Sequence, residues 1–523
     1  MVNDRETQDA PAQVFLKYRI AKSEKLGRYM IAEKDLVAGE VILRESPVSV
    51  GPTAFFEGSL CFNCHKPIVQ PELKRYNCTK CKVAPLCQPA CELVPGYHKN
   101  AECSLFRSNQ LYSSKISDHS TVLLPLRLWL LRQTETELWK HIDLMEDHVK
   151  ERRGTHIWSI REQTVVQVLH KLRLVPDDSE TSELMQRICG ILDVNSFELR
   201  SSGESELEGH LLRGLYTKAA LMAHNCRGNT HLTVDERDEL AIYASVDIKK
   251  GATIYFNYTG SLLGSAKRRE NLREGKYFEC ECTLCRDPFE LKSNLSSLVC
   301  PRCRQGYVGI QNPLTSNPYG LKTKWQCERC KSLLSGKMIK TTLNLTRSLI
   351  ENTENFDTKA LESLLTKLLL TVHTNHYLAL DLKEKLLVNY RKEMSAINPR
   401  KKILERILNL HREGLAVLDI VEPGISRQKG IRLYEMHLAT ALIAKKNYAA
   451  REISPLELSL QLKEAQDLLR KALSNLLLEP TGTPEGRLAK LALQQMKLLR
   501  ENMTDANALA TPGQKPKTQT MKH

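Results

Sequence analysis

Hydrophobic and polar positions alternate with two different periods along this chain. Residues 26–47 alternate apolar and polar side chains on either side of a turn at Gly39, which predicts short strands. Residues 105–200 and 338–502 instead repeat apolar side chains three and four positions apart, the spacing of amphipathic helices. The pattern therefore predicts a β-rich part that is followed by two separate sets of helices.

The second set of helices leaves two architectures open. Pro423 and Gly424 stop one of its helices, but no strict repeat of about 34 residues is present. The stretch is similar to a TPR-like helical array, and a plain helical bundle that walls a substrate cleft explains the pattern equally well. The polar residues 503–523 should form a disordered tail.

Length and composition exclude two classes of protein. The 523 residues, at roughly 150 per domain, allow about three or four structural units. Hydrophobic residues at 41% and charged residues at 26% are near globular averages, so wholesale disorder is excluded. The long apolar run at residues 123–131 contains an arginine and is far shorter than the ~20 residues that span a bilayer, so we expect no membrane segment.

The chain is basic without long blocks of one sign. Its 76 lysines and arginines against 61 aspartates and glutamates give a net charge of +15. Such an excess can favour nucleic-acid partners, but a mixed, solvated surface accounts for it as well. We expect no direct nucleic-acid binding and keep DNA binding as the third hypothesis for function.

Cysteine is the exception in the composition, with 16 residues. The chain opens without a charged and then apolar signal peptide, so we expect a reducing compartment, the nucleus and cytoplasm. Clustered cysteines there bind metals more often than they form disulfides. Between Cys61 and Cys103 the knuckle spacing offers eight ligands, including His98, which suits two tetrahedral structural zinc sites better than surface thiols paired by chance.

Two further clusters lie between residues 280 and 330. The later one has the spacing of a self-sufficient zinc ribbon, with Tyr307 and Trp325 as its small packing residues. The earlier one offers three thiolates and needs a fourth, for which Cys226 in a polar turn suits better than Cys189 in an apolar helical stretch. The clusters consist of Cys280, Cys282 and Cys285, and of Cys300, Cys303, Cys327 and Cys330.

The first cluster resembles the MYND zinc finger in the order and spacing of its ligands. The resemblance implies that ligands one, two, five and six share one ion and that the others share the second. The first set is Cys61, Cys64, Cys87 and Cys91, and the second is Cys78, Cys81, His98 and Cys103. Four residues separate His98 from Cys103, where the usual finger has three.

Three separate stretches resemble the SET domain of protein-lysine methyltransferases. They are residues 26–47, residues 214–232, which resemble the Asn-His-Ser-Cys-x-Pro-Asn motif and its lead-in, and residues 248–260 followed by the CxC-x2-C cluster. With a finger inserted between the first two, the combination is similar to the SET and MYND domain (SMYD) family, in its arthropod-type SmydA branch. In that family Cys226 matches the motif cysteine that supplies the fourth ligand of the post-SET zinc site.

The resemblance implies an α+β fold in eight parts. They are the N-terminal SET part (14–58), the MYND finger (59–104), a helical insert (105–206), the C-terminal SET part (207–266), the post-SET zinc knuckle (267–290), the zinc ribbon (291–337), the TPR-like helical domain (338–502) and the tail (503–523).

The resemblance also implies a reaction and a cofactor. Tyr258 takes the position of the family tyrosine that aligns the lysine amine and contacts the methyl group of S-adenosylmethionine, although the sequence YFNY also suits an ordinary packed strand. The implied cofactor-binding residues are Gly27, Arg28, Asn195, His224, Tyr258 and Phe278. The chain departs from the family pattern at Tyr29, Ala223, Asn225, Gly228 and Lys276, of which Lys276 and Tyr29 replace a tyrosine and the second glycine of a Gly-x-Gly turn.

Two hypotheses for function follow. The first is a monomeric, S-adenosylmethionine-dependent methyltransferase with four zinc ions that acts on a lysine of a histone or non-histone protein or peptide. The second is a catalytically weak or inactive adaptor in chromatin and transcription regulation, a repressor that binds proline-rich peptides through its MYND finger. The departures at Tyr29 and Ala223 favour the second hypothesis, and the three SET-like stretches favour the first.

Overall fold

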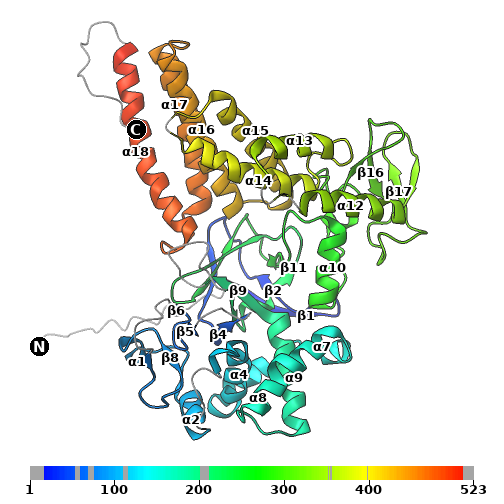
Figure 1. Cartoon of the computed structure of the whole chain (residues 1–523), viewed down its shortest axis with the longest axis vertical. Helices are drawn as coiled ribbons and strands as arrows, with labels where there is room; N and C mark the ends of the chain where they lie inside the picture. The colour runs from blue at the N-terminus through cyan, green and yellow to red at the C-terminus, as the bar shows by residue number, and fades with distance from the viewer. Residues whose placement is uncertain are drawn as a thin grey trace, which may run out of the picture.

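The computed structural model describes residues 17–53, 59–68, 76–109, 116–200, 211–351, 353, 356–396 and 398–510. The fold is mixed α/β, as the sequence predicts, with a helical carboxyl-terminal region. Short strands occupy the middle of the molecule, one set of helices lies at one end, and the carboxyl-terminal helices lie at the other (Figure 1).

The β-rich part is built from two stretches that are far apart in the sequence. β1 (Tyr18–Ser23) and β2 (Gly27–Ala32) form a hairpin. The other small sheets combine β3 (Val41–Glu45) with β12 (Thr230–Val234) and β13 (Leu240–Ala244), β4 (Ser49–Pro52) with β9 (Ser196–Arg200) and β10 (Leu211–Leu215), and β11 (Ala223–His224) with β14 (Tyr255–Phe256). Strands before residue 53 thus pair with strands after residue 195, which makes everything between them an insertion.

The predicted turn at Gly39 leads into β3. Gly39 has a φ of +87°, a left-handed conformation that a residue without Cβ adopts at little cost. Its N–H donates to the Ala244 carbonyl at 2.8 Å, and the Ala244 N–H donates to the Glu40 carbonyl at 2.9 Å. Apolar residues of these strands, among them Met30, Ile42 and Ile242, then share one buried core. Their burial does not alternate as predicted, because Met30–Ala32 in β2 and the pair Ile42 and Leu43 in β3 are buried consecutively.

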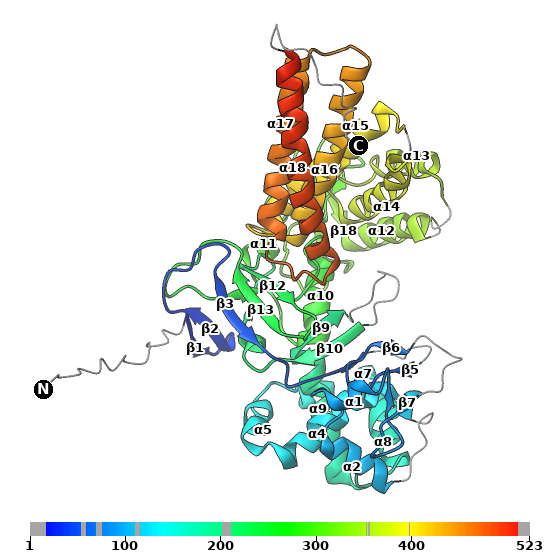
Figure 2. The same ribbon diagram turned by 90° about the vertical axis from the view of Figure 1, so that its left-hand side faces the viewer.

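The insertion begins with the finger segment, residues 59–68 and 76–108. It contains β5 (Ser59–Leu60), β6 (Pro67–Ile68), β7 (Tyr76–Asn77), β8 (Pro85–Leu86), α1 (Ala90–Leu93) and α2 (Asn100–Ser108). Its buried residues share one hydrophobic core with the helices that follow, so the finger segment packs on the insert rather than standing alone (Figure 2).

The helices of the insert follow the predicted pattern, with one interruption. They are η1 (Ser120–Val122), α4 (Leu123–Thr134), α5 (Thr136–Asp143), α6 (Val149–Arg152), α7 (His156–Arg161), η2 (Glu162–Val166), α8 (Gln167–Lys171) and α9 (Ser179–Asn195). Within the predicted helical region 105–200, the π-helical turn η2 interrupts the regular helix between α7 and α8. β9 begins at Ser196, and the expected end of the insert at 206 lies outside the described residues.

Beyond the β-rich part the chain forms two helices and a four-stranded antiparallel sheet. These are α10 (Ser265–Lys276), α11 (Thr283–Arg286), β15 (Leu298–Val299), β16 (Tyr307–Ile310), β17 (Lys324–Cys327) and β18 (Leu333–Ser335), with η3 (Ala219–Leu221) earlier in the chain. Trp325 of β17 is buried in this four-stranded sheet, and its indole N–H donates to the Pro318 carbonyl at 2.9 Å. The ring of Tyr307 instead meets His373 of the helical region at 4.4 Å between centroids.

The carboxyl-terminal region is a series of helices, most of which pack on the next in sequence. They are α12 (Gly336–Glu351), α13 (Thr358–Leu368), α14 (Tyr377–Met394), α15 (Lys401–Val421), α16 (Arg427–Ala449), α17 (Pro455–Leu476) and α18 (Pro484–Ala510). At the predicted stop, Gly424 has a φ of +77°, and the Ile425 N–H donates to the Ser245 carbonyl of the β-rich part at 2.8 Å.

The expectation of a disordered tail from residue 503 is wrong for its first part. Residues 503–510 continue α18, where Ala506 is fully buried and anchors the last turns. Residues 511–523 lie outside the described part of the chain. Among the described helices, none is both long enough and apolar enough to cross a membrane.

Candidate functional site

Tyr258 lies two residues beyond β14 and is held at both ends by one segment. Because β11 pairs in parallel with β14, His224 lies beside Phe256 and its ring reaches the following residues. The Tyr258 N–H donates to His224 Nδ1 at 3.0 Å, and the Tyr258 hydroxyl donates to the Met222 carbonyl. Burial raises the pKa of Tyr258, so its hydroxyl remains a hydrogen-bond donor at neutral pH.

A cavity of about 690 Å³ opens beside Tyr258. Aromatic rings and paired charges line it. The Phe197 and Phe256 centroids lie 6.1 Å apart, and those of Phe256 and Tyr258 lie 6.3 Å apart. The charged residues of the lining are Arg161, Asp193, Glu198, Arg213 and Lys276.

The Asp193 carboxylate is already satisfied by arginines. Arg161 reaches it at 2.7 Å, Arg213 at 2.9 Å and Arg152 at 2.9 Å. These charge-assisted bonds hold the pKa of Asp193 below its usual range although burial of the carboxyl opposes them. The three arginines thus share one carboxylate, so the cluster gives this wall of the cavity an excess of positive charge.

Lys276, the last residue of α10, reaches into this cavity. Its ammonium donates to the Val194 carbonyl and lies 5.6 Å from the centroid of the Tyr258 ring. Burial lowers the pKa of Lys276 to about 8, an effect that Asp193 and Glu198 partly oppose. The sequence shows Lys276 as a departure from an aromatic position, but it does not show where the ammonium lies.

Two of the six predicted cofactor-binding residues, Arg28 and Asn195, contact the segment 144–148. Arg28 donates to the Leu144 carbonyl at 2.7 Å, and the Asn195 amide donates to the Glu146 carbonyl at 2.8 Å. The ring of His148 meets that of Tyr277 at 4.7 Å between centroids. The β1–β2 hairpin and the residues before Cys280 are thus both brought to this segment.

The six predicted cofactor-binding residues divide into those that line the cavity and those that lie outside its lining. Gly27 has a φ of +63°, and a Cβ placed on it meets no atom within 4 Å, so the backbone there is open to a ligand. The His224 ring lies 5.1 Å from the Tyr258 ring and 5.7 Å from the Phe278 ring. Of the six predicted residues, Asn195 and Tyr258 line the cavity, whereas Gly27, Arg28, His224 and Phe278 lie outside its lining.

The structure brings the cysteines together in the four groups that the sequence predicts. Within each group the four possible ligand atoms lie within 4.8 Å of one another. The groups are Cys61, Cys64, Cys87 and Cys91; Cys78, Cys81, His98 and Cys103; Cys226, Cys280, Cys282 and Cys285; and Cys300, Cys303, Cys327 and Cys330. Cys189 lies outside them, fully buried in α9, and burial raises its pKa to about 12, as expected for an inert thiol.

A buried carboxylate orients the one imidazole among these groups. His98 Nδ1 lies 2.7 Å from Glu102 Oε1, and His98 Nε2 lies 3.6 Å from the Cys81 sulfur. Arg127 of α4 donates to Glu102 at 2.6 Å and to the Val50 carbonyl at 2.9 Å. A carboxylate behind a histidine that faces thiolates is the usual arrangement around structural zinc.

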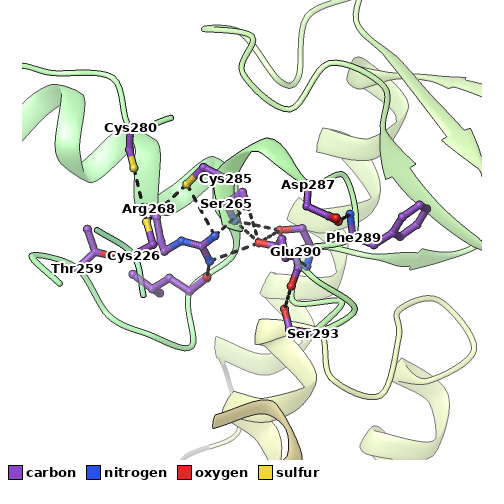
Figure 3. A network of polar contacts seen from close by, with 12 residues as sticks. Cys226, Thr259, Ser265, Arg268, Cys280, Cys285, Asp287, Phe289, Glu290 and Ser293 are labelled. Carbon is purple, nitrogen blue, oxygen red and sulfur yellow. Dashed lines mark hydrogen bonds and ion pairs between the residues drawn. The ribbon is translucent and has the colours of Figure 1, made fainter. Parts of the chain in front are cut away.

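The knuckle segment, residues 280–285, is stabilised differently, as Figure 3 shows. Its sulfurs lie 3.9 Å (Cys280) and 3.5 Å (Cys285) from that of Cys226. The fully buried guanidinium of Arg268 lies 4.0 Å from the Cys285 sulfur and 3.3 Å from the buried carboxylate of Glu290. A cation in direct contact with the sulfurs favours their thiolate form, which metal binding needs.

Sequence reasoning missed four of these residues. Two carried a usable signal: Glu102 lies one helical turn after His98, and Arg127 is the single charge in the apolar run 123–131. The other two, Arg268 and Lys276, lie in α10, whose one large apolar residue is Leu272, so its pattern separates buried charges from exposed ones poorly.

Comparisons with known proteins agree with this arrangement. The SET domain family matches residues 27–259. The SET domain-containing protein SmydA-8, isoform A, of Drosophila melanogaster is 29% identical over 323 residues, which cover 60% of this chain and 65% of that protein. The human histone-lysine N-methyltransferase SMYD3 is 24% identical over 275 residues, 52% of this chain and 61% of that protein.

A third relative, the histone-lysine N-methyltransferase Smyd1 of Mus musculus, is 23% identical over 281 residues, 50% of this chain and 54% of that protein. The matches thus span less than two thirds of each of these relatives. The matched SET domain, residues 27–259, coincides with most of the β-rich part and with its insertion. The chain thus contains a SET-like region and is similar to SmydA-8, SMYD3 and Smyd1, which supports the SET and MYND domain (SMYD) family and its SmydA-like branch.

Proposed function

We propose that this chain is an S-adenosylmethionine-dependent protein-lysine N-methyltransferase that contains zinc. The observation that carries the proposal is Tyr258, whose hydroxyl is held by the Met222 carbonyl at the edge of a cavity with aromatic walls. The relatives named histone-lysine N-methyltransferases support the same reaction class. We infer a histone or non-histone lysine as the acceptor.

The side chains beside the cavity suit the handling of a lysine amine. The rings of Phe197, Phe256 and Tyr258 exclude water and stabilise an alkylammonium group through their faces. Tyr258, fixed at its N–H and its hydroxyl, can align the amine for in-line attack without reorganising. The bound cofactor supplies a methyl group on a sulfonium, which makes it the electrophile of the reaction.

The residues around Gly27 fit such a cofactor in part. The open side of Gly27 leaves room for close approach, and His224 and Phe278 lie together near the knuckle segment. Lys25 of the β1–β2 turn contacts Glu281 at 2.7 Å and brings that turn to the knuckle segment. We propose Gly27, Arg28, Asn195, His224, Tyr258 and Phe278 as the residues that hold the cofactor.

We further propose one structural zinc ion in each of the four cysteine groups. Soft sulfur and imidazole donors at tetrahedral spacing, with no open position, suit zinc and a structural role. We call the group of Cys226, Cys280, Cys282 and Cys285 the knuckle group. It is linked to Tyr258 through His224, because Cys226 Sγ lies 3.4 Å from His224 Nε2 and His224 Nδ1 accepts from the Tyr258 N–H.

Exchange of Tyr258 tests the proposed function. We expect Tyr258→Phe to lower methyl transfer to a lysine peptide library at least about 100-fold, as loss of one oriented hydroxyl in a water-excluded site does. Cofactor affinity measured by calorimetry should fall much less than activity, because the phenylalanine keeps the ring of Tyr258 and loses only its hydroxyl. The control Tyr255→Phe, in the neighbouring strand β14, should keep full activity. A purified, zinc-loaded chain that binds no S-adenosylmethionine would contradict the proposal.

One observation favours a second function. Arg28 and the Asn195 amide are both engaged by backbone carbonyls of the chain itself, and Ala223 replaces a family asparagine. These contacts fit an inactive adaptor in transcriptional repression that recruits proline-rich partners through the finger segment. Methylation by the native chain that disappears in Tyr258→Phe would exclude the adaptor. Action as a monomer in the nucleus and cytoplasm stays a prediction.

A further inference from the structure

The cavity beside Tyr258 already contains a lysine side chain that belongs to the chain itself. The ammonium of Lys276 donates to the Val194 carbonyl, which lies in the last turn of α9 and has no partner within that helix. It also lies 5.6 Å from the centroid of the Tyr258 ring. A carbonyl and an aromatic face are the partners that an incoming lysine ammonium needs.

The backbone around Lys276 directs it there. α10 ends at Lys276, and the next residue, Tyr277, adopts a left-handed conformation with a φ of 61° and stacks on His148. The chain therefore turns sharply after Lys276 while its side chain continues toward Val194. The contact is fixed by a helix end and a ring contact, and does not depend on the Lys276 side chain alone.

The other charged residues of the cavity do not compete with Lys276 for the Val194 carbonyl. Arg161 and Arg213 are paired with Asp193 at 2.7 and 2.9 Å, so neither competes for the Val194 carbonyl. Asp193 and Glu198 both act on the Lys276 ammonium favourably. A second ammonium that entered beside Tyr258 would meet the like charge of Lys276 and find its hydrogen-bond acceptor taken.

We propose that Lys276 is an internal pseudosubstrate, which holds the amine position beside Tyr258 and must be displaced by any lysine that the enzyme methylates. The inference rests on the proposed function, since it assigns the cavity to the acceptor lysine. It makes Lys276 a specificity-determining residue, because only peptides whose flanking residues offset the displacement can enter. Removal of the competing ammonium lowers the KM for acceptor peptides and leaves cofactor affinity unchanged.

The first test compares methyl transfer by full-length variants on one lysine peptide library. Lys276→Met and Lys276→Tyr should lower the KM for acceptor peptides about tenfold or more. In these variants no ammonium of the chain itself has to leave the amine position before a peptide lysine binds there. Lys276→Arg keeps the cation and should retain the high KM. The control Lys463→Met removes an exposed lysine of α17 and should behave as the native chain. An unchanged KM in Lys276→Met and Lys276→Tyr would overturn the inference and leave the proposed function standing.

A second test needs no catalysis. Thermal unfolding of Lys276→Ala is followed with n-butylammonium chloride as the probe and with potassium chloride at the same concentration. The probe should refill the vacated position and raise the unfolding midpoint of Lys276→Ala by about 2–4 °C at near-saturation, with no effect on the native chain. Equal shifts in both proteins would overturn the inference. If the probe stabilises Lys276→Ala but no variant transfers a methyl group, the proposed function is rejected, while the position of the Lys276 ammonium in the cavity is supported.

Discussion

The finger segment and the knuckle segment each have a buried arginine of a neighbouring helix beside their thiols, Arg127 of α4 and Arg268 of α10, but the two arginines act differently. In the finger segment Arg127 acts at a distance, through Glu102, on the orientation of His98. In the knuckle segment Arg268 touches the Cys285 sulfur itself. The mixed group needs its imidazole oriented, whereas the all-thiol group needs a positive charge close by.

The two groups also differ in what they connect. The second group of the finger takes all its ligands from residues 78–103, so it closes a local loop. The knuckle group joins Cys226 to residues 280–285, and Cys226 lies next to the histidine that positions Tyr258. Loss of the finger group should therefore cause a local defect, whereas loss of the knuckle group should also disturb the candidate site around Tyr258.

Metal removal should have the largest effect and tests whether the groups hold zinc at all. Structural zinc in finger peptides contributes on the order of 10–16 kcal/mol of apparent binding free energy. We expect chelation to release four zinc ions per chain and to abolish the near-ultraviolet circular dichroism of the chain. Release of two ions, measured by elemental analysis, would mean that half of the groups are not metal sites.

Arg268→Met should be the most damaging single substitution in this comparison. It leaves the carboxylate of Glu290 buried without its cation, which costs about 3–5 kcal/mol in the free energy of unfolding. Arg127→Met should cost a similar amount through Glu102. Arg273→Met, which breaks a partly exposed pair with Glu279, should cost about 1 kcal/mol or less. Chemical denaturation measures all three, and equal costs would erase the distinction between buried and exposed arginines.

Cys226→Ser should separate the two groups most clearly. Loss of one of four ligands removes about a quarter of the metal binding free energy, roughly 2.5–4 kcal/mol per site. We expect one zinc ion fewer per chain and a loss of methyl transfer, because His224 and Tyr258 lose their anchor. Cys78→Ser should also lose one ion but keep activity, and Cys189→Ser should change neither. Full activity in Cys226→Ser would show that the knuckle group does not support the site.

Glu102→Gln should have the smallest effect on metal binding, although it also leaves the buried Arg127 without its anion and so lowers the free energy of unfolding. A lost carboxylate behind a ligating histidine lowers metal affinity about 10–100-fold, or about 1.4–2.7 kcal/mol. Competition with a chelator should show one of the finger ions leaving more easily, while methyl transfer is unchanged. A loss of activity would contradict the view that the finger segment acts locally.

The cysteine groups could be predicted because their chemistry is encoded in spacing. Short loops between paired thiols bring both sulfurs to one ion whatever the surrounding fold does. Cys226 was the harder case, and the polarity of its turn, supported by the family resemblance, was enough to distinguish it from Cys189. The β-strands around Gly39 were likewise predicted from local alternation, although their buried residues are consecutive.

The surroundings of the site could not be predicted, because they depend on how helices end. Lys276 reaches the Val194 carbonyl because α10 ends there, where Tyr277 adopts a left-handed backbone conformation, and because α9 ends nearby. Arg28 and Asn195 match family positions in sequence, yet the structure engages both with the segment 144–148, which no pattern connects to them. The π-helical turn η2 is a third case of a tertiary effect that overrides periodicity.

The separation of Cys226 from its partners has a consequence for biosynthesis. The two finger groups are complete once Cys103 has left the ribosome, so they can acquire their ions while most of the chain is still being made. Cys226 must wait until Cys285, 59 residues later, has been translated. We therefore expect an order of metallation during synthesis, with the finger segment filled first and Tyr258 positioned last.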